Sequence, residues 1–293
     1  MVKRLVRKIW EFPIVILMFR IFVLFLILAC GITPLAAKAE IRIALVVGNG
    51  SYSTVSSLDN PARDAKLMAN TLKRLGFEVS LLVNSNQADL RLGISQFGRD
   101  LRNAGRDATV LFYYAGHGVQ SFGTNYLLPV DIDLIDTADL DLVAIEAASV
   151  LQQMKFAKNQ TNIVILDACR NNPFENIPTF DDNGLAEMNT PTGTFLSYAT
   201  APGEAAFDGA GGNSPFTSAL ANELMVAGVL VEQMFKKVRV AVFKETGGLQ
   251  TPWDASSLTA DFIFAAGKAE ISISDSSKAT RAITQAPSPE QYD

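Results

Sequence analysis

The chain has 293 residues, of which 48% are hydrophobic and 19% are charged, a balance that excludes a disordered protein and allows one large buried core. The formal net charge is −5; setting aside residues 1–39 removes six basic residues and one acidic residue, which leaves 19 basic against 29 acidic residues and a net charge of −10. An acidic body of this kind disfavours nucleic acid as a partner and would attract basic peptides.

Residues 1–39 have the composition of a targeting segment. A run of ten apolar residues, Ile21–Cys30, precedes Ala37-Lys38-Ala39, which has the small-x-small form of a leader-peptidase site, and the basic residues before that run include Lys3, Arg4, Arg7 and Lys8. We therefore expect an exported protein, periplasmic or secreted. Two alternatives are an uncleaved anchor in the inner membrane, formed by Phe12–Gly31, and lipidation at Cys30. All three place the rest of the chain outside the cytoplasm.

The first half of the remaining chain alternates between two patterns. Apolar, β-branched runs predict strands at 41–47, 77–83 and 108–114, and amphipathic patterns predict helices at 62–75 and 86–102. Helices between successive strands indicate a parallel, doubly wound sheet in an α/β domain. We expect one domain over residues 40–266 and a disordered tail, rich in Ser, Thr, Ala and Pro, over 267–293.

The second half continues with less regular spacing. A short strand is predicted at 125–130, a helix at 145–158, and strands at 161–169 and 193–200. Two further helices are predicted at 215–227 and 231–244. The segment 201–213, with four glycines, is predicted to be a mobile loop beside a cleft.

Two of the predicted strands end at a reactive side chain. Strand 108–114 runs into Gly116-His117-Gly118, and strand 161–169 ends at Cys169. His117 is the only histidine, and Cys169 is the only cysteine outside residues 1–39. Because parallel strands present their carboxyl ends at one edge of a sheet, the imidazole and the thiol could meet there as base and nucleophile. The flanking glycines predict an exposed His117, and the alternative for Cys169 taken alone is a small buried hydrophobic residue.

The motifs around these two residues, YYAGHG and DACRNN with His117 and Cys169 separated by 52 positions, resemble those of the caspase-like cysteine peptidases. Asp167 stands where caspases have Gln, so the chain is more similar to the bacterial metacaspase and paracaspase type. The resemblance implies a caspase-haemoglobinase-like three-layer fold, with a mostly parallel sheet and helices on both faces. It also implies a cysteine endopeptidase with Cys169 as nucleophile and His117 as base. The backbone N–H groups of Gly118 and Cys169 would form the oxyanion hole.

Four acids are candidates for substrate binding. Asp167 lies two residues before Cys169 and therefore on the same side of its strand, where a substrate Arg or Lys would be a suitable partner. Asp64 lies in the first turn of the helix 62–75, where the helix macrodipole favours an acid, and the resemblance places an Asp of this stretch in the primary specificity pocket. Glu204 or Asp208, in the loop 201–213, could add to that pocket. The expected partner is a peptide or protein with a basic residue before the scissile bond.

No cofactor is required by this chemistry, but calcium has two candidate sites. Five acids between Asp131 and Asp141 could hold calcium, although their spacing favours a solvated loop. Asp181-Asp182 could bind calcium, as in many metacaspases. The segment between Arg170 and Lys236 contains no Lys or Arg, so an enzyme specific for basic residues could not cut itself there. We therefore expect a single-chain active form.

The end of the domain also resembles the family. Gln250–Trp253 followed by 258–264 resembles the final loop and strand, and we expect Trp253 to be a core residue, with the wall of a pocket as the alternative. The alternative to an enzyme is a non-catalytic caspase-like binding module in the cell envelope. A third class is another thiol hydrolase or transferase on a doubly wound fold, which would leave Asp167 unexplained.

Overall fold

The computed structural model describes residues 40–169, 173–174, 177, 184–209 and 212–267. The predicted targeting segment, the tail from residue 268 and Asp181-Asp182 lie outside these residues. In the part of the chain that the structure describes, no helix is both long enough and apolar enough to cross a bilayer.

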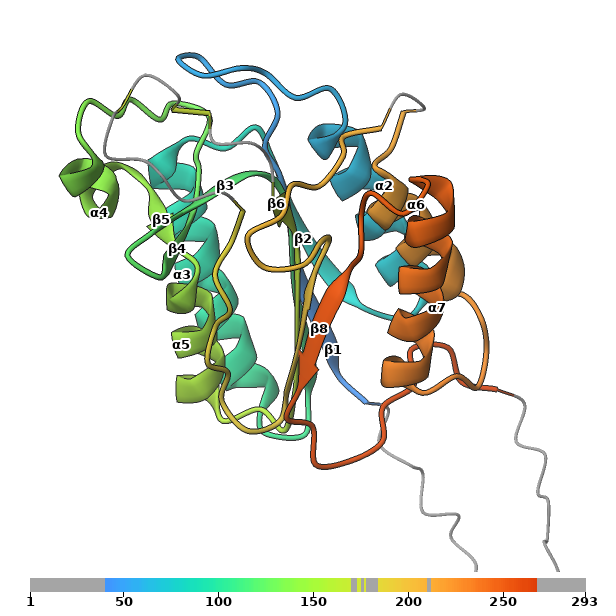
Figure 1. The fold of residues 1–293 in the computed structure, drawn as a ribbon. Helices are drawn as coiled ribbons and strands as arrows, with labels where there is room; N and C mark the ends of the chain where they lie inside the picture. Colours follow the sequence, from blue (N-terminus) through green and yellow to red (C-terminus); the bar gives the residue numbers. More distant parts are fainter. Residues whose placement is uncertain (1–39, 170–172, 175–176, 178–183, 210–211, 268–293) are drawn as a thin grey trace, which may run out of the picture. The chain divides into compact units, whose positions relative to one another are not determined.

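A mixed, mostly parallel sheet forms the centre of the domain (Figure 1). Its main strands run in the order β2-β1-β3-β6-β7-β8, with four successive parallel pairings and one antiparallel pairing at the β7–β8 end. The strands are β1 (Arg42–Gly48), β2 (Glu78–Val83), β3 (Thr109–Ser121), β6 (Thr161–Cys169), β7 (Thr194–Tyr198) and β8 (Trp253–Ser256).

Helices cover both faces of the sheet. Figure 1 shows α3 and α5 on one face and α2, α6 and α7 on the other, which confirms the expected three-layer α/β arrangement. Polar caps fix the starts of two of them: the Asn86 side chain accepts from the Asp89 N–H (2.8 Å), and Ser214 Oγ accepts from the Thr217 N–H (2.9 Å). The helices are α2 (Pro61–Arg74), α3 (Gln87–Ala104), α5 (Ala148–Ala157), α6 (Pro215–Glu223) and α7 (Val231–Glu245).

Strand β3 continues well beyond the predicted end at residue 114. It pairs with β6 up to Ala115↔Asp167, shifts register, and resumes at Gly118↔Cys169. Three steps on β3 match two on β6, so one extra residue is inserted as a β-bulge at 116–117. Beyond the bulge, β3 pairs antiparallel with β4 (Thr124–Leu127), which pairs with β5 (Ile145–Glu146).

Two other segments differ from the sequence-based expectation. Residues 145–146 form β5 and not the first turn of a helix, because their backbone pairs with β4. The acidic segment contains the short 3-10 helix η1 (Thr137–Asp139) and α4 (Leu140–Val143).

The predicted final strand at 258–264 is wrong. The last strand is β8, which begins at Trp253, and residues 258–264 contribute only the isolated bridge Leu230↔Ile263 among the described residues. Phe262 and Phe264 are buried, so the apolar pattern correctly reports burial there but not strand pairing. Trp253 is 45% exposed, contrary to the expected core position, because it lies on the edge strand β8.

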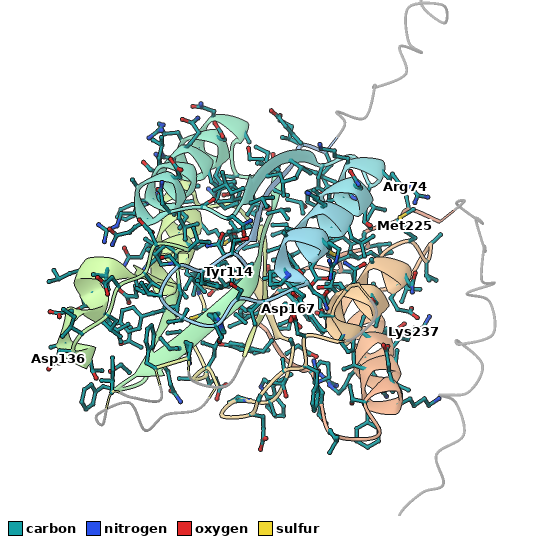
Figure 2. All side chains as sticks on the ribbon, turned by 90° about the horizontal axis from the view of Figure 1, so that it is seen from above. Arg74, Tyr114, Asp136, Asp167, Met225 and Lys237 are labelled. Atoms are coloured by element: carbon teal, nitrogen blue, oxygen red, sulfur yellow. The ribbon has the colours of Figure 1, made fainter. Side chains whose placement is uncertain are left out.

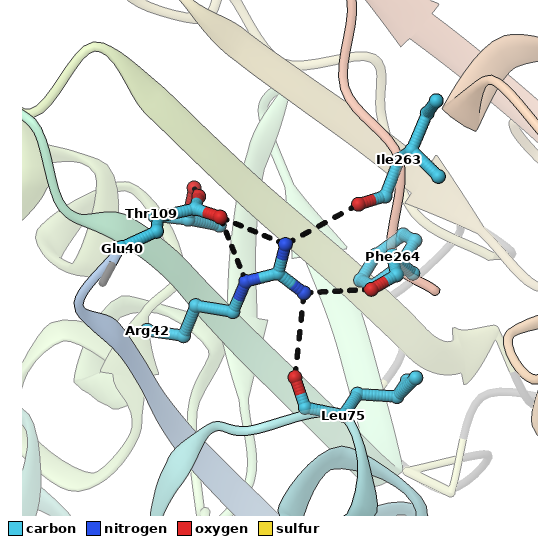
Figure 3. Close-up of polar contacts among 6 residues, drawn as sticks. All are labelled: Glu40, Arg42, Leu75, Thr109, Ile263 and Phe264. Carbon is cyan, nitrogen blue, oxygen red and sulfur yellow. Dashed lines mark hydrogen bonds and ion pairs between the residues drawn. The ribbon is translucent and has the colours of Figure 1, made fainter. Parts of the chain in front are cut away.

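Arg42 holds this C-terminal segment against the start of β1 (Figure 3). Its guanidinium donates to the carbonyl oxygens of Phe264 (2.6 Å), Leu75 (3.3 Å) and Ile263 (3.4 Å). It also forms an ion pair with Glu40 (2.8 Å). These bonds satisfy backbone carbonyls that no sheet partner reaches, which explains how the segment packs without becoming a strand.

Candidate active site

The β3 bulge sets the position of His117. The bulge interrupts the regular alternation of side chains just before this residue. The imidazole is only 3% exposed, so the expectation of an exposed histidine is wrong. Tyr52 accounts for part of that burial, because its ring centroid lies 4.7 Å from that of the imidazole. Tyr52 belongs to the loop that follows β1, a distant part of the sequence.

The backbone and the ring of His117 are both hydrogen-bonded to that loop. Its backbone N–H donates to the Tyr52 hydroxyl at 2.7 Å, and its ring Nε2 lies 2.8 Å from the Ser56 carbonyl oxygen. A carbonyl oxygen only accepts, so Nε2 must carry the hydrogen of this bond. Nδ1 is then the ring nitrogen that can exchange a proton with a nucleophile. The Ser56 carbonyl therefore holds the imidazole ring through Nε2–H.

Glycine is required on both sides of His117 for steric reasons. Gly116 has a φ of +153°, and a Cβ there would lie 2.7 Å from the Tyr52 hydroxyl and 2.8 Å from the Tyr114 hydroxyl. A Cβ at Gly118 would lie 2.8 Å from the Ala168 carbonyl oxygen on β6. The two strands therefore approach closely at the position where the bulge ends.

Cys169 is the last residue of β6, and its backbone is in register with Gly118. The side chain of Cys169 lies outside what the structure describes. The backbone places the two residues proposed for the oxyanion hole on neighbouring parallel strands, at the carboxyl edge of the sheet. His117 lies at the same edge, one residue before Gly118.

Asp64 and Asp167 come together in one buried cluster, although they are far apart in the sequence. Both residues have 0% relative exposure. Ser214, the N-cap of α6, contacts both: its N–H donates to Asp64 Oδ1 (3.0 Å), and its hydroxyl donates to Asp167 Oδ2 (2.5 Å). Figure 2 shows Asp167 between α2 and α6. The N-cap of α6 thus gives one N–H to Asp64 and one hydroxyl to Asp167, at the positive end of the helix dipole.

Further donors complete this acid cluster. The Asn213 side-chain amide donates to Asp64 Oδ1 at 2.7 Å, and the Thr217 hydroxyl donates to Asp167 Oδ2 at 2.9 Å. Since Thr217 uses its proton for Asp167, the buried Tyr113 hydroxyl at 2.5 Å must donate to Thr217. These donors were not predicted from the sequence. The Ser214-Pro215 pair is a helix-start signal that could have identified Ser214 as one of them.

Glu204 and Asp208 occupy different surroundings. Glu204 is exposed, and Asp208 is half-buried with Oδ2 accepting from the Asp59 N–H at 3.0 Å. The Asn60 side chain donates to the Gly209 carbonyl (3.0 Å) and the Arg63 side chain to that of Gly212 (2.5 Å), so the end of this loop is fixed to the start of α2. The described hydrogen bonds do not join either acid to Asp64 or Asp167, and their role in substrate binding stays a prediction.

The acidic segment 131–141 uses its carboxylates for local hydrogen bonds. Asp131 accepts from the Gln87 N–H (2.9 Å), Asp136 from the Ala138 N–H (2.9 Å) and Asp141 from the Tyr126 hydroxyl (2.6 Å). Burial, together with the bond to Asp141, raises the pKa of Tyr126 to about 12. Within the described residues, His, Cys, Asp and Glu form no group of three that could hold a metal ion.

Comparison with known proteins identifies the family of this chain. Residues 41–263 match the model of the caspase domain. Over 172 residues, 58% of the chain, it is 28% identical to mucosa-associated lymphoid tissue lymphoma translocation protein 1 from Homo sapiens and to its homologue from Mus musculus. The chain spans about a fifth of the length of these relatives, 20% and 19% respectively.

The fold is also that of solved caspases. The crystal structure of caspase-1 from Spodoptera frugiperda superposes with a TM-score of 0.56 at 17% identity, covering 79% of this chain and 92% of the other. The matched family model extends over most of the sequence, from the first residue before β1 to the bridge at Ile263. The chain belongs to the caspase-domain family.

Proposed function

We propose that this chain is a cysteine endopeptidase that cleaves after Arg or Lys through a dyad of Cys169 and His117. The main support is the position of the two acids relative to Cys169. Asp167 lies in one buried cluster with Asp64, and Cys169 follows Asp167 by two residues on β6. Membership of the caspase-domain family supports the cysteine peptidase. The two carboxylates support the basic specificity, because a buried cation is favoured beside paired acids.

In the proposed reaction, His117 Nδ1 takes the proton of the Cys169 thiol, Sγ forms a bond to the substrate carbonyl carbon, and the carbonyl π electron pair moves onto oxygen. The N–H groups of Gly118 and Cys169 stabilise that oxyanion. The C–N bond then breaks, and the amine leaves with a proton from His117 Nδ1. Water, deprotonated by the same nitrogen, hydrolyses the thioester and restores the thiol. Throughout, the Ser56 carbonyl holds Nε2–H and keeps the ring in one orientation.

Fluorogenic peptides that differ only in Arg, Lys or Asp before the scissile bond test this proposal, with wild-type protein and Cys169→Ala, with and without calcium. We expect hydrolysis after Arg or Lys in the wild type and background rates in the variant. Hydrolysis after Asp would overturn the proposed specificity for Arg or Lys. No hydrolysis under either condition would favour the non-catalytic binding module.

We also propose that the domain acts outside the cytoplasm. Supporting this, the predicted leader-peptidase site ends at Ala39, and the second of the two units into which the chain divides begins at Glu40. Glu40 accepts from Arg42 Nε at 2.9 Å and so takes part in the domain itself. The mass of the mature protein tests this: export with cleavage gives a chain that starts at Glu40, whereas an anchored form keeps residues 1–39 and follows the membrane fraction.

A further inference from the structure

The loop between β1 and α2 contacts His117 in three ways, and two of them come from Tyr52. The Tyr52 hydroxyl accepts the His117 N–H at 2.7 Å, and its ring lies against the imidazole with a centroid distance of 4.7 Å and an interplanar angle of 50°. The third contact is the Ser56 carbonyl at Nε2. Tyr52 is 6% exposed, so its ring fills space that water would otherwise occupy.

Tyr114 holds the carbonyl side of His117. Its hydroxyl donates to the carbonyl oxygen of His117 itself (2.8 Å) and lies 3.0 Å from that of Leu128. Burial, followed by the neighbouring Tyr52, raises the pKa of Tyr114 well above its ordinary value, so this donor keeps its proton. The two tyrosine hydroxyls thus hold the N–H and the C=O of the same residue. They also occupy the space that a side chain at 116 would need.

The loop has anchors of its own that do not involve His117. Asn84 Oδ1 accepts from the N–H groups of Gly50 (2.9 Å) and Ser51 (3.1 Å). The Ser53 N–H donates to the Val130 carbonyl at 3.0 Å. Removing the Tyr52 hydroxyl should therefore leave the course of the loop intact, which makes a conservative variant informative.

We propose that Tyr52 is a positioning residue for His117. Its hydroxyl fixes the backbone of the bulge, and its ring fixes the plane of the imidazole and favours the imidazolium form by a cation–π contact. Tyr52 and Tyr114 are the titratable side chains that the described contacts place against this segment, and neither needs to ionise. The proposal rests on the proposed function, because it gives His117 the role of catalytic base.

His117 is the only histidine in the chain, so its ring gives a single imidazole signal set in NMR of the histidine-labelled full-length protein. Three variants are compared: Tyr52→Phe removes the hydroxyl, Tyr52→Leu removes the ring as well, and Ser53→Ala is the matched control in the same loop. We expect Tyr52→Leu to lower the pKa of His117 by about 0.5 to 1 unit, because the cation–π contact is lost. In Tyr52→Phe the ring remains, so the pKa of His117 should stay close to the wild-type value.

In peptide hydrolysis, we expect Tyr52→Phe to reduce kcat about five- to tenfold with KM changed less than twofold, because one hydrogen bond to the base is lost. Ser53→Ala should match the wild type in both assays. A His117 pKa unchanged in Tyr52→Leu would overturn the ring contact, and an unchanged kcat in Tyr52→Phe would overturn the hydroxyl role.

The two assays separate this proposal from the proposed function. If the wild type hydrolyses no peptide, the peptidase fails, while the NMR titration of the same variants still decides whether Tyr52 controls the imidazole. If Tyr52→Leu does not fold, the chemical shifts and the pKa of His117 in Tyr52→Phe test the proposal instead. Shifted ring signals would support the hydroxyl contact. Spectra identical to those of the wild type would contradict it.

Discussion

Both edges of the sheet hold charged side chains, but the described partners of these side chains differ in kind. At the amino edge, the Arg42 guanidinium is paired with Glu40, and its remaining N–H groups go to backbone carbonyls, between the rings of Phe77 (5.6 Å) and Phe262 (5.5 Å). At the carboxyl edge, Asp64 and Asp167 accept from hydroxyls, an amide and a backbone N–H. These described donors are neutral groups, and they orient the oxygens of the two carboxylates.

We interpret Arg42 as a structural charge, in contrast to the substrate-binding role proposed above for Asp64 and Asp167. An arginine paired with the exposed Glu40 carboxylate and bonded to three backbone carbonyls stabilises the fold. Asp64 and Asp167 lie at the carboxyl edge of a parallel sheet, where substrates of such folds bind, and this position underlies their proposed role in specificity. Removing one charge at each edge should therefore affect different properties of the protein.

The largest effect is expected at the carboxyl edge. Asp167→Asn keeps the shape of the side chain and an oxygen that can accept from Ser214 and Thr217, but it removes one charge from the acid cluster. We expect kcat/KM for Arg substrates to fall about 100-fold or more, because a buried charge-assisted contact is lost, with little change in thermal stability. Steady-state kinetics with Arg and uncharged peptides measure this.

Asp136→Asn is the matched control, since Asp136 caps η1 with the same chemistry at a site away from the acid cluster. Its kcat/KM should stay within twofold of the wild type. Equal losses in the two variants, or Arg cleavage by Asp167→Asn at the wild-type rate, would contradict the distinction between the two edges.

A smaller effect, on stability alone, is expected at the amino edge. Arg42→Met keeps an apolar stem between the two phenylalanine rings but leaves the carbonyls of Phe264 and Leu75 without their donor. We expect the free energy of unfolding to fall by about 3 kcal/mol, with kcat/KM nearly unchanged, as measured by guanidinium unfolding and peptide hydrolysis.

Arg99→Met on α3 is the comparison for Arg42→Met. Arg99 is exposed and donates only to the side chains of Ser95 and Gln96 among the hydrogen bonds described, so we expect a change within about 0.5 kcal/mol. The interpretation of Arg42 as a structural charge is refuted if Arg42→Met unfolds at the wild-type denaturant concentration.

The amino-acid pattern alone predicts the strands that carry the site. The apolar runs that end near Gly116 and at Cys169 identify two strands of the parallel sheet, and alternation places Asp167 on the Cys169 side of β6. The role of Asp64 came from family resemblance, because nothing in a helix-opening acid indicates that it will meet Asp167 through the cap of another helix.

The burial of His117 could not be predicted in the same way. It depends on a bulge and on Tyr52, which lies 65 positions earlier in the sequence, and neither leaves a local hydropathy signal. The segment 258–264 shows the related difficulty: buried phenylalanines produce a strand-like pattern, whereas its carbonyls bond to Arg42. Hydropathy reports which side chains are buried, but not which backbone groups pair.

The smallest predicted effect concerns Asp254, a charged residue at neither of the two sites compared above. Asp254 on β8 is partly buried and pairs with Arg239 of α7. Burial raises the pKa of Asp254 above its ordinary 3.8 despite the opposing effect of Arg239, so the folded state binds the proton more tightly than the unfolded chain does. The wild type therefore loses stability as the pH rises from about 3.8 through the raised folded pKa, whereas Asp254→Asn does not titrate there.

We accordingly expect the stability of Asp254→Asn relative to the wild type to improve as the pH is raised from 4 to 7, measured by guanidinium unfolding at each pH. In the protein that retains Asp254, Arg239→Gln should make the stability more dependent on pH, because it removes the charge that lowers the pKa of Asp254. A relative stability that moves the other way would mean that the ion pair outweighs burial. Asp254 would then resemble Arg42 at the amino edge, as a charge whose partner stabilises the fold.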